Sequence, residues 1–100
     1  MLNITKYSKA SSLKLTLEGR LDTTTAPTLE AQVKDSLAGI TELKFDIEKL
    51  EYISSAGLRV LLSCQKTMNR QQGRMVISNA SEEVKEIFDV TGFSDILTLE

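Results

Sequence analysis

Polar and apolar residues alternate along two segments of this 100-residue chain. Leucines alternate with polar residues over positions 13–17, and leucine, phenylalanine and isoleucine do so over positions 43–47. A period of two is typical of a β-strand with one buried and one solvated face. Weaker apolar runs predict strands at 74–78 and 95–99, with an edge strand near 2–7. The pattern therefore predicts a sheet of four to five strands.

Helical spacing appears in the segments between these strands. Apolar residues recur every fourth position over residues 29–37, which predicts a helix that Thr25 caps and Gly39 ends. A later helix is expected to begin at a Ser81 N-cap, to carry acidic residues in its first turn and to end at Gly92. Both segments lie where a helix would connect neighbouring strands.

The element order predicts an α/β fold with a mixed sheet. Because the strongest strands alternate strictly, one face of the sheet should be solvated and the helices should pack mainly on the other face. A chain of this length can form one core, and no repeat or Pro/Ser/Gly-rich linker divides it. Residues 1–100 are therefore expected to form a single domain.

A third helix is predicted to follow a loop near residue 52. At about 100° per residue, with Ser55 at zero, the core stripe lies between about 140° and 240°. Its members are Gly57, Val60, Leu61, Cys64 and Met68. Leu58, Arg59 and Leu62 fall within about 60° of Ser55, on the face expected to meet solvent.

Two exposed leucines beside a hydroxyl at a helix start favour a protein interaction site. The alternatives are structural. Ser54 and Ser55 are residues of the kind that cap helices, and loops could cover Leu58 and Leu62. Spacing alone does not choose between these interpretations.

Charge and composition exclude several functions. Twelve Lys and Arg against 14 Asp and Glu give a net charge of -2, and no basic run is present, so no nucleic-acid partner is expected. No signal pattern and no run of eighteen apolar residues occurs, which predicts a cytoplasmic protein without direct membrane insertion. Without histidine and with one cysteine, no metal site and no cofactor are expected.

An enzymatic role is also disfavoured by the residues present. Without histidine, neither Ser55 nor Cys64 can be activated by an imidazole base. A lysine-activated serine remains an alternative, but no Ser-x-x-Lys motif follows Ser55. Cys64 lies on the core stripe, where a buried, unreactive thiol is expected. We therefore expect no catalytic residues.

Two motifs resemble those of the STAS family, which includes the anti-sigma factor antagonists. The segment Ile53-Ser54-Ser55-Ala56-Gly57-Leu58 is similar to the family's Asp-Ser-(Ser/Thr/Ala)-Gly-Leu signature. The segment Glu18-Gly19-Arg20-Leu21-Asp22, followed by a threonine-rich step, is similar to its Gly-Glu-Leu-Asp segment. The order of predicted elements agrees over nearly the whole chain.

The resemblance implies a bacterial regulator of transcription. In such a partner-switching system, the unphosphorylated protein binds an anti-sigma factor serine kinase and releases a sigma factor. Phosphorylation of Ser55 ends the binding, and a serine phosphatase reverses it. The residues implied in partner binding are Asp22, Thr23, Thr24, Ser54, Gly57, Leu58, Arg59 and Leu62.

Three positions differ from the family pattern. Ser54 stands where Asp is usual and is a rival phosphorylation site, Arg59 replaces Gly, and Arg20 replaces Glu. Arg59 lies four residues after Ser55 and could pair with a phosphate there. Another role within the same family is also open, that of an accessory subunit of a transporter or signalling assembly that phosphorylation does not control.

Overall fold

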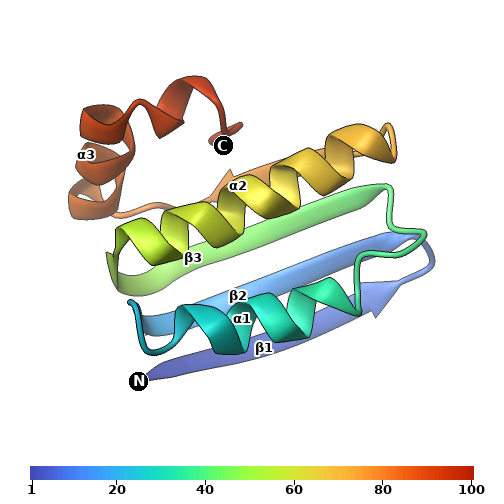
Figure 1. Cartoon of the computed structure of the whole chain (residues 1–100), viewed down its shortest axis with the longest axis horizontal. Helices are drawn as coiled ribbons and strands as arrows, with labels where there is room; N and C mark the ends of the chain where they lie inside the picture. The colour runs from blue at the N-terminus through green and yellow to red at the C-terminus, as the bar shows by residue number, and fades with distance from the viewer.

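The computed structural model describes residues 1–100 as a four-stranded sheet with helices on one side (Figure 1). The elements are β1 (Leu2–Lys9), β2 (Ser12–Leu21), α1 (Ala26–Lys34), β3 (Glu42–Ile53), α2 (Ser55–Arg70), β4 (Arg74–Ser78), α3 (Glu82–Thr91) and a 3-10 turn, η1 (Phe93–Asp95). The sheet order is β1-β2-β3-β4, and only the β1–β2 pair is antiparallel. The predicted mixed α/β class is confirmed.

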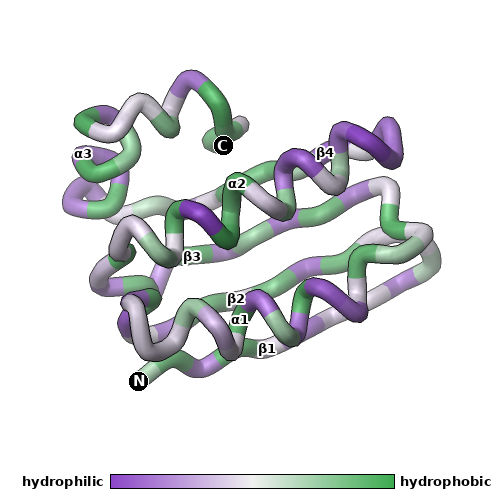
Figure 2. The backbone as a smooth tube through the Cα atoms, in the orientation of Figure 1, coloured by the Kyte–Doolittle hydropathy of each residue, from purple (hydrophilic) through white to green (hydrophobic).

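Alternating leucines place one face of β2 in the core. Leu13, Leu15 and Leu17 are each at most 3% exposed, whereas Lys14 between them and Glu18 after them are exposed. Figure 2 shows the same alternation of hydrophobic and hydrophilic positions along the strands. Burying one leucine contributes about 1.5–3 kcal/mol, so this pattern fixes which face of the sheet the helices cover.

The strand predicted at residues 43–47 extends further, to Ile53. Beyond Ile47 the buried positions are Leu50 and Ile53, so the period of two is lost. Two register shifts in the β2–β3 pairing account for this, because each adds one residue to β3. The sequence pattern therefore placed the end of the strand too early.

The strand predicted at residues 95–99 is absent. Residues 93–95 form η1 instead, and only Leu99 pairs with the sheet, through an isolated bridge to Ile77. The predicted edge strand near residues 2–7 is confirmed as β1, which extends to Lys9.

Helix ends were predicted correctly for α3 and less well for α1. Ser81 caps α3 by accepting a hydrogen bond from the backbone N–H of Val84, and Gly92 ends it at a φ of 80°. In contrast, α1 ends at Lys34, before Gly39. None of the helices combines the length and the hydropathy that a membrane-spanning helix needs.

The start of the chain lies beside the end of β2. The carbonyl oxygen of Met1 accepts a hydrogen bond from the backbone N–H of Arg20 at 3.0 Å. Gly19, at a φ of 108°, permits this approach, because a Cβ there would collide with that carbonyl oxygen. The antiparallel β1–β2 pairing thus holds Met1 near the carboxyl end of β2.

Candidate functional site

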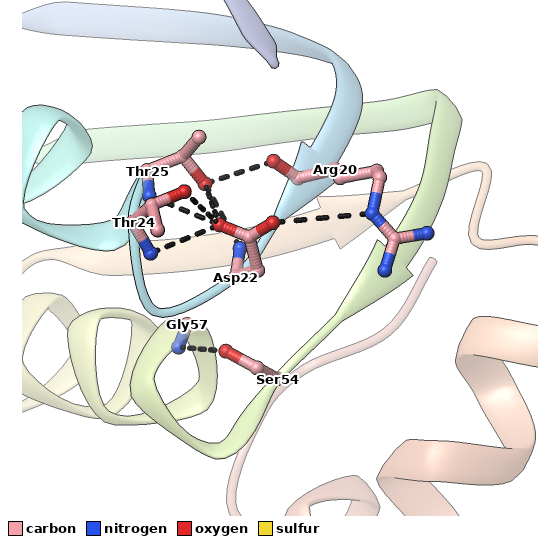
Figure 3. A network of polar contacts seen from close by, with 6 residues as sticks. All are labelled: Arg20, Asp22, Thr24, Thr25, Ser54 and Gly57. Carbon is pink, nitrogen blue, oxygen red and sulfur yellow. Dashed lines mark hydrogen bonds and ion pairs between the residues drawn. The ribbon is translucent and has the colours of Figure 1, made fainter.

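The two resemblance motifs meet at one edge of the sheet. Because β2 and β3 are parallel, their carboxyl ends lie side by side, with Leu21 opposite Ile53. The backbone N–H of Ser54 donates to the carbonyl oxygen of Leu21 at 2.8 Å. This bond ties the start of α2 to the end of β2, and Figure 3 shows the residues of the loop after β2 and of the helix start.

Asp22 holds the loop after β2 in shape. Its Oδ1 accepts hydrogen bonds from the backbone N–H of Thr24 at 3.0 Å, the Thr24 hydroxyl at 2.7 Å and the backbone N–H of Thr25 at 3.1 Å (Figure 3). The Thr24 hydroxyl is the largest cause that lowers the pKa of Asp22 from 3.8 to about 2. Asp22 is therefore ionised at neutral pH.

The two adjacent serines have different environments. Ser54 is the N-cap of α2, and its hydroxyl oxygen accepts a hydrogen bond from the backbone N–H of Gly57 at 3.3 Å (Figure 3). Ser55 is the first residue of α2 and is exposed. The first turn of the helix contains no acidic residue. The capping role falls to Ser54, which leaves the Ser55 hydroxyl accessible.

Gly57 allows α2 to start close to the sheet. A Cβ at Gly57 would lie 2.7 Å from Cγ of Leu21 and 2.9 Å from Cγ1 of Ile53, both shorter than ordinary contact distances. Gly57 is itself buried. Its contribution to the site is therefore the position it gives the helix, since it has no side chain to present to a partner.

The expected exposure of Leu58 is wrong. Leu58 is only 4% exposed and belongs to the core, and Leu62 is half-buried. On the same angular scale Leu58 lies at about 300°, so the buried arc of α2 is wider than the predicted stripe. Leu58 belongs to the same core cluster as the predicted stripe, so this flank of α2 is buried as well.

The other residues implied in partner binding remain accessible. Thr23 and Thr24 are exposed in the loop after β2, and Arg59 is exposed one turn along α2 from Ser55. The loop and the helix start therefore form one surface, with Ser55 on the helix side and the threonines on the loop side.

Tyr52 lies at the same end of the sheet, although the sequence pattern did not identify it. It lies opposite Arg20 in the β2–β3 register, and the guanidinium carbon of Arg20 is 4.5 Å from its ring centroid. The Nε of Arg20 is 3.9 Å from Oδ2 of Asp22 (Figure 3). Arg20 and Tyr52 each precede the last buried residue of a strand, and this shared position is the signal that could have paired them.

Cys64 is removed from the site and from solvent. It is 2% exposed, and burial raises the pKa of its thiol to about 12. The structure also contains no group of three or more cysteine, aspartate or glutamate side chains arranged to hold a metal ion. The chemistry available at the sheet edge is thus that of a hydroxyl, backbone amides and surface charges.

Together these features define a small mixed α/β domain that presents an exposed serine at a helix start, beside an acidic loop. The chain belongs to the STAS domain family, whose model matches residues 2–100.

Relatives share most of the chain. A Bordetella bronchiseptica protein named "Putative anti-sigma factor antagonist BtrV" is 36% identical over 81 residues, which are 80% of this chain and 70% of that protein. The anti-sigma-B factor antagonist of Bacillus subtilis is 24% identical over 98 residues, which are 98% of this chain and 90% of that one. Both names describe antagonists of anti-sigma factors.

Solved structures have the same fold. An anti-sigma factor antagonist from Mycobacterium paratuberculosis matches with a TM-score of 0.87 and 19% identity, over 99% of this chain and 85% of that one. The Bacillus cell fate determinant SpoIIAA in its phosphorylated form matches with a TM-score of 0.77 and 17% identity, over 98% and 91%. At these identities the likeness concerns the fold.

Proposed function

We propose that this protein is an anti-sigma factor antagonist that phosphorylation of Ser55 switches off. In its unphosphorylated form it binds an anti-sigma factor serine kinase in the cytoplasm and releases a sigma factor. The kinase inactivates it by transferring a phosphoryl group from ATP to the Ser55 hydroxyl, and a serine phosphatase restores it. The role is one of binding, without catalysis by this chain.

The observation that carries the proposal is the division of roles between two serines. Ser54 supplies the cap of α2, so the exposed Ser55 has no structural bond to lose on modification. The names of the relatives support the antagonist role. One structural neighbour was solved in its phosphorylated form, which supports the view that this fold tolerates a phosphoryl group.

Electrostatics supports a switch that acts on binding and spares the fold. A phosphate on Ser55 adds about -1.5 to -2 charges, and a helix N-terminus favours an anion by about 0.3–1 kcal/mol. Arg59 lies one turn away and forms no ion pair in the structure, so it is available to pair with that phosphate. The same charge in a desolvated interface is costly unless the partner supplies a cation.

Substitution of Ser55 tests this proposal. The kinase is first identified by affinity purification with the unmodified chain and mass spectrometry, and binding is then measured with the purified kinase. Ser55→Asp is expected to weaken binding about tenfold or more, which corresponds to about 1.4 kcal/mol. Ser55→Ala should bind and, with ATP, should acquire no phosphate at residue 55.

Ser54→Ala is the matched control, because it removes the cap and keeps the switch residue. Loss of the cap should cost about 1 kcal/mol and lower the melting temperature by about 4–8 °C. Both Ser55 variants should melt close to the unmodified protein. Normal binding by Ser55→Asp, or phosphate on Ser54 in place of Ser55, would contradict the proposal. Recovery of a membrane transporter in place of a kinase would favour an accessory role.

A further inference from the structure

Arg20 and Tyr52 lie on the sheet face that the helices leave open, at the same edge as Ser55. The residues that follow them, Leu21 and Ile53, are buried against the helices, so the preceding side chains point to the opposite face. The side chain of Arg20 is 54% exposed and Tyr52 is 37% exposed. The pair is thus held between two strands and is open to a partner.

Stacking orients the guanidinium of Arg20. Its carbon lies 4.5 Å from the ring centroid of Tyr52, within the range of a cation–π interaction. A guanidinium held over a ring loses less side-chain entropy when it binds a ligand than a free one does. Tyrosine and arginine are also the residue types enriched where binding energy concentrates in protein interfaces.

Asp22 leaves the hydrogen-bonding capacity of Arg20 unused. The 3.9 Å between Nε of Arg20 and Oδ2 of Asp22 is too long for a hydrogen bond, and Oδ1 of Asp22 is taken by Thr24 and Thr25. Neither terminal nitrogen of Arg20 has a hydrogen-bond partner, and Figure 3 shows both pointing away from the Asp22 network. Asp22 therefore attracts the guanidinium of Arg20 but leaves its N–H groups free to donate hydrogen bonds to a ligand.

We propose that Arg20 and Tyr52 form a carboxylate-recognition site, which takes an aspartate or glutamate side chain of the protein partner. The planar fork of Arg20 matches a carboxylate with two parallel N–H···O bonds, and Tyr52 supplies apolar contact beside it. The inference rests on the proposed function only in that the partner docks at this edge. Arg20 stands where the family pattern has an acidic residue. The partner surface that faces Arg20 should therefore be acidic.

Other cationic side chains on the surface could also bind a carboxylate. A surface hollow of about 430 Å³ lies near the amino ends of β2 and β3 and includes Lys9, Lys44 and Arg74. In that hollow Lys44 pairs with Glu100 at 3.1 Å, and the Ser12 hydroxyl binds Glu42 at 3.0 Å. Lys9 and Arg74 form no ion pair, but neither is stacked on an aromatic ring as Arg20 is. A test must therefore separate the two sites.

Titration with defined peptides makes this separation. The full chain is titrated with an alternating Glu-Ser peptide and with the matched Lys-Ser peptide, and NMR follows the Nε–H signal of Arg20 and the ring signals of Tyr52. The acidic peptide is expected to shift both sets of signals, and the basic peptide neither. Arg20→Gln should weaken the binding of the acidic peptide about fivefold, as expected for about 1 kcal/mol.

Three further variants sharpen the result. Arg20→Lys keeps the charge and loses the planar fork, so it should restore little affinity, and Tyr52→Leu should also weaken binding. Arg74→Gln removes a cation of the distant hollow and should change nothing. Equal binding by Arg20→Gln, or shifts confined to the hollow, would overturn the proposal. Since no kinase takes part, this outcome is independent of the Ser55 test.

Discussion

At the scale of single residues, Asp22 joins the electrostatics of the site to the stability of its loop. Hydrogen bonds from Thr24 and Thr25 converge on one carboxylate oxygen of Asp22, and they lower its pKa to about 2. A group with a lowered pKa stabilises the fold at pH values above its unfolded pKa and loses that contribution as the pH falls through its folded pKa. For Asp22 this window runs from about pH 4 down to about pH 2.

Asp22→Asn should therefore have a pH-dependent effect. The variant retains an oxygen that can accept one of the bonds but carries no charge, so it is expected to be less stable than the parent at neutral pH. The difference in unfolding free energy should stay constant above about pH 4 and shrink toward pH 2. Urea denaturation of both proteins across this range measures it, and a difference that grew on acidification would show that Asp22 is not stabilised as an anion.

At the scale of elements, the burial of Leu58 changes which residues of α2 can contact a partner. Leu58→Ala should destabilise the protein by about 2–5 kcal/mol, because it opens a cavity in the core. Leu62→Ala, at a half-buried position one turn later, should cost about 1 kcal/mol or less. Urea denaturation of both variants measures the loss of unfolding free energy. Equally small losses would show that Leu58 is exposed and not part of the core.

Local sequence patterns predicted helices and strands well where neighbouring residues alone decide the structure, as in an alternating strand or a capped helix end. The alternation over residues 13–17 marked β2, and Ser81 and Gly92 marked the ends of α3. The signals failed where tertiary contacts decided the outcome. The register shifts in β3 disrupt the period of two, so the strand appeared to end at Ile47 when it extends to Ile53.

The candidate site divides in the same way. The serine at the start of α2 and the acidic loop could be found from motifs, because both are contiguous in sequence. The stacking of Arg20 on Tyr52 joins residues 32 positions apart, and only the pairing of β2 with β3 brings them together. Likewise, the burial of Leu58 depends on tertiary packing, which a helical wheel drawn for α2 alone does not include.

At the scale of the whole molecule, Cys64 reports on the integrity of the core. The residue is 2% exposed, and burial raises the pKa of its thiol to about 12, so at pH 8 the thiol is neutral and inaccessible. A thiol reagent should therefore label the native protein slowly and the urea-unfolded protein fast. Moving the thiol to the exposed neighbouring position, with Ser63→Cys in a Cys64→Ala background, should allow fast labelling of the native state. Equal native rates for the two proteins would contradict a closed core.

The bond between Met1 and Arg20 has a practical consequence for fusion proteins. Any peptide joined ahead of Met1 leaves the molecule beside the proposed recognition arginine, so an amino-terminal affinity tag would crowd the surface under study. The last residue, Glu100, pairs with Lys44 near the opposite end of β3. Tags and surface tethers therefore belong at the carboxyl end, and a fluorophore at the amino end would be a proximity sensor for a docked partner.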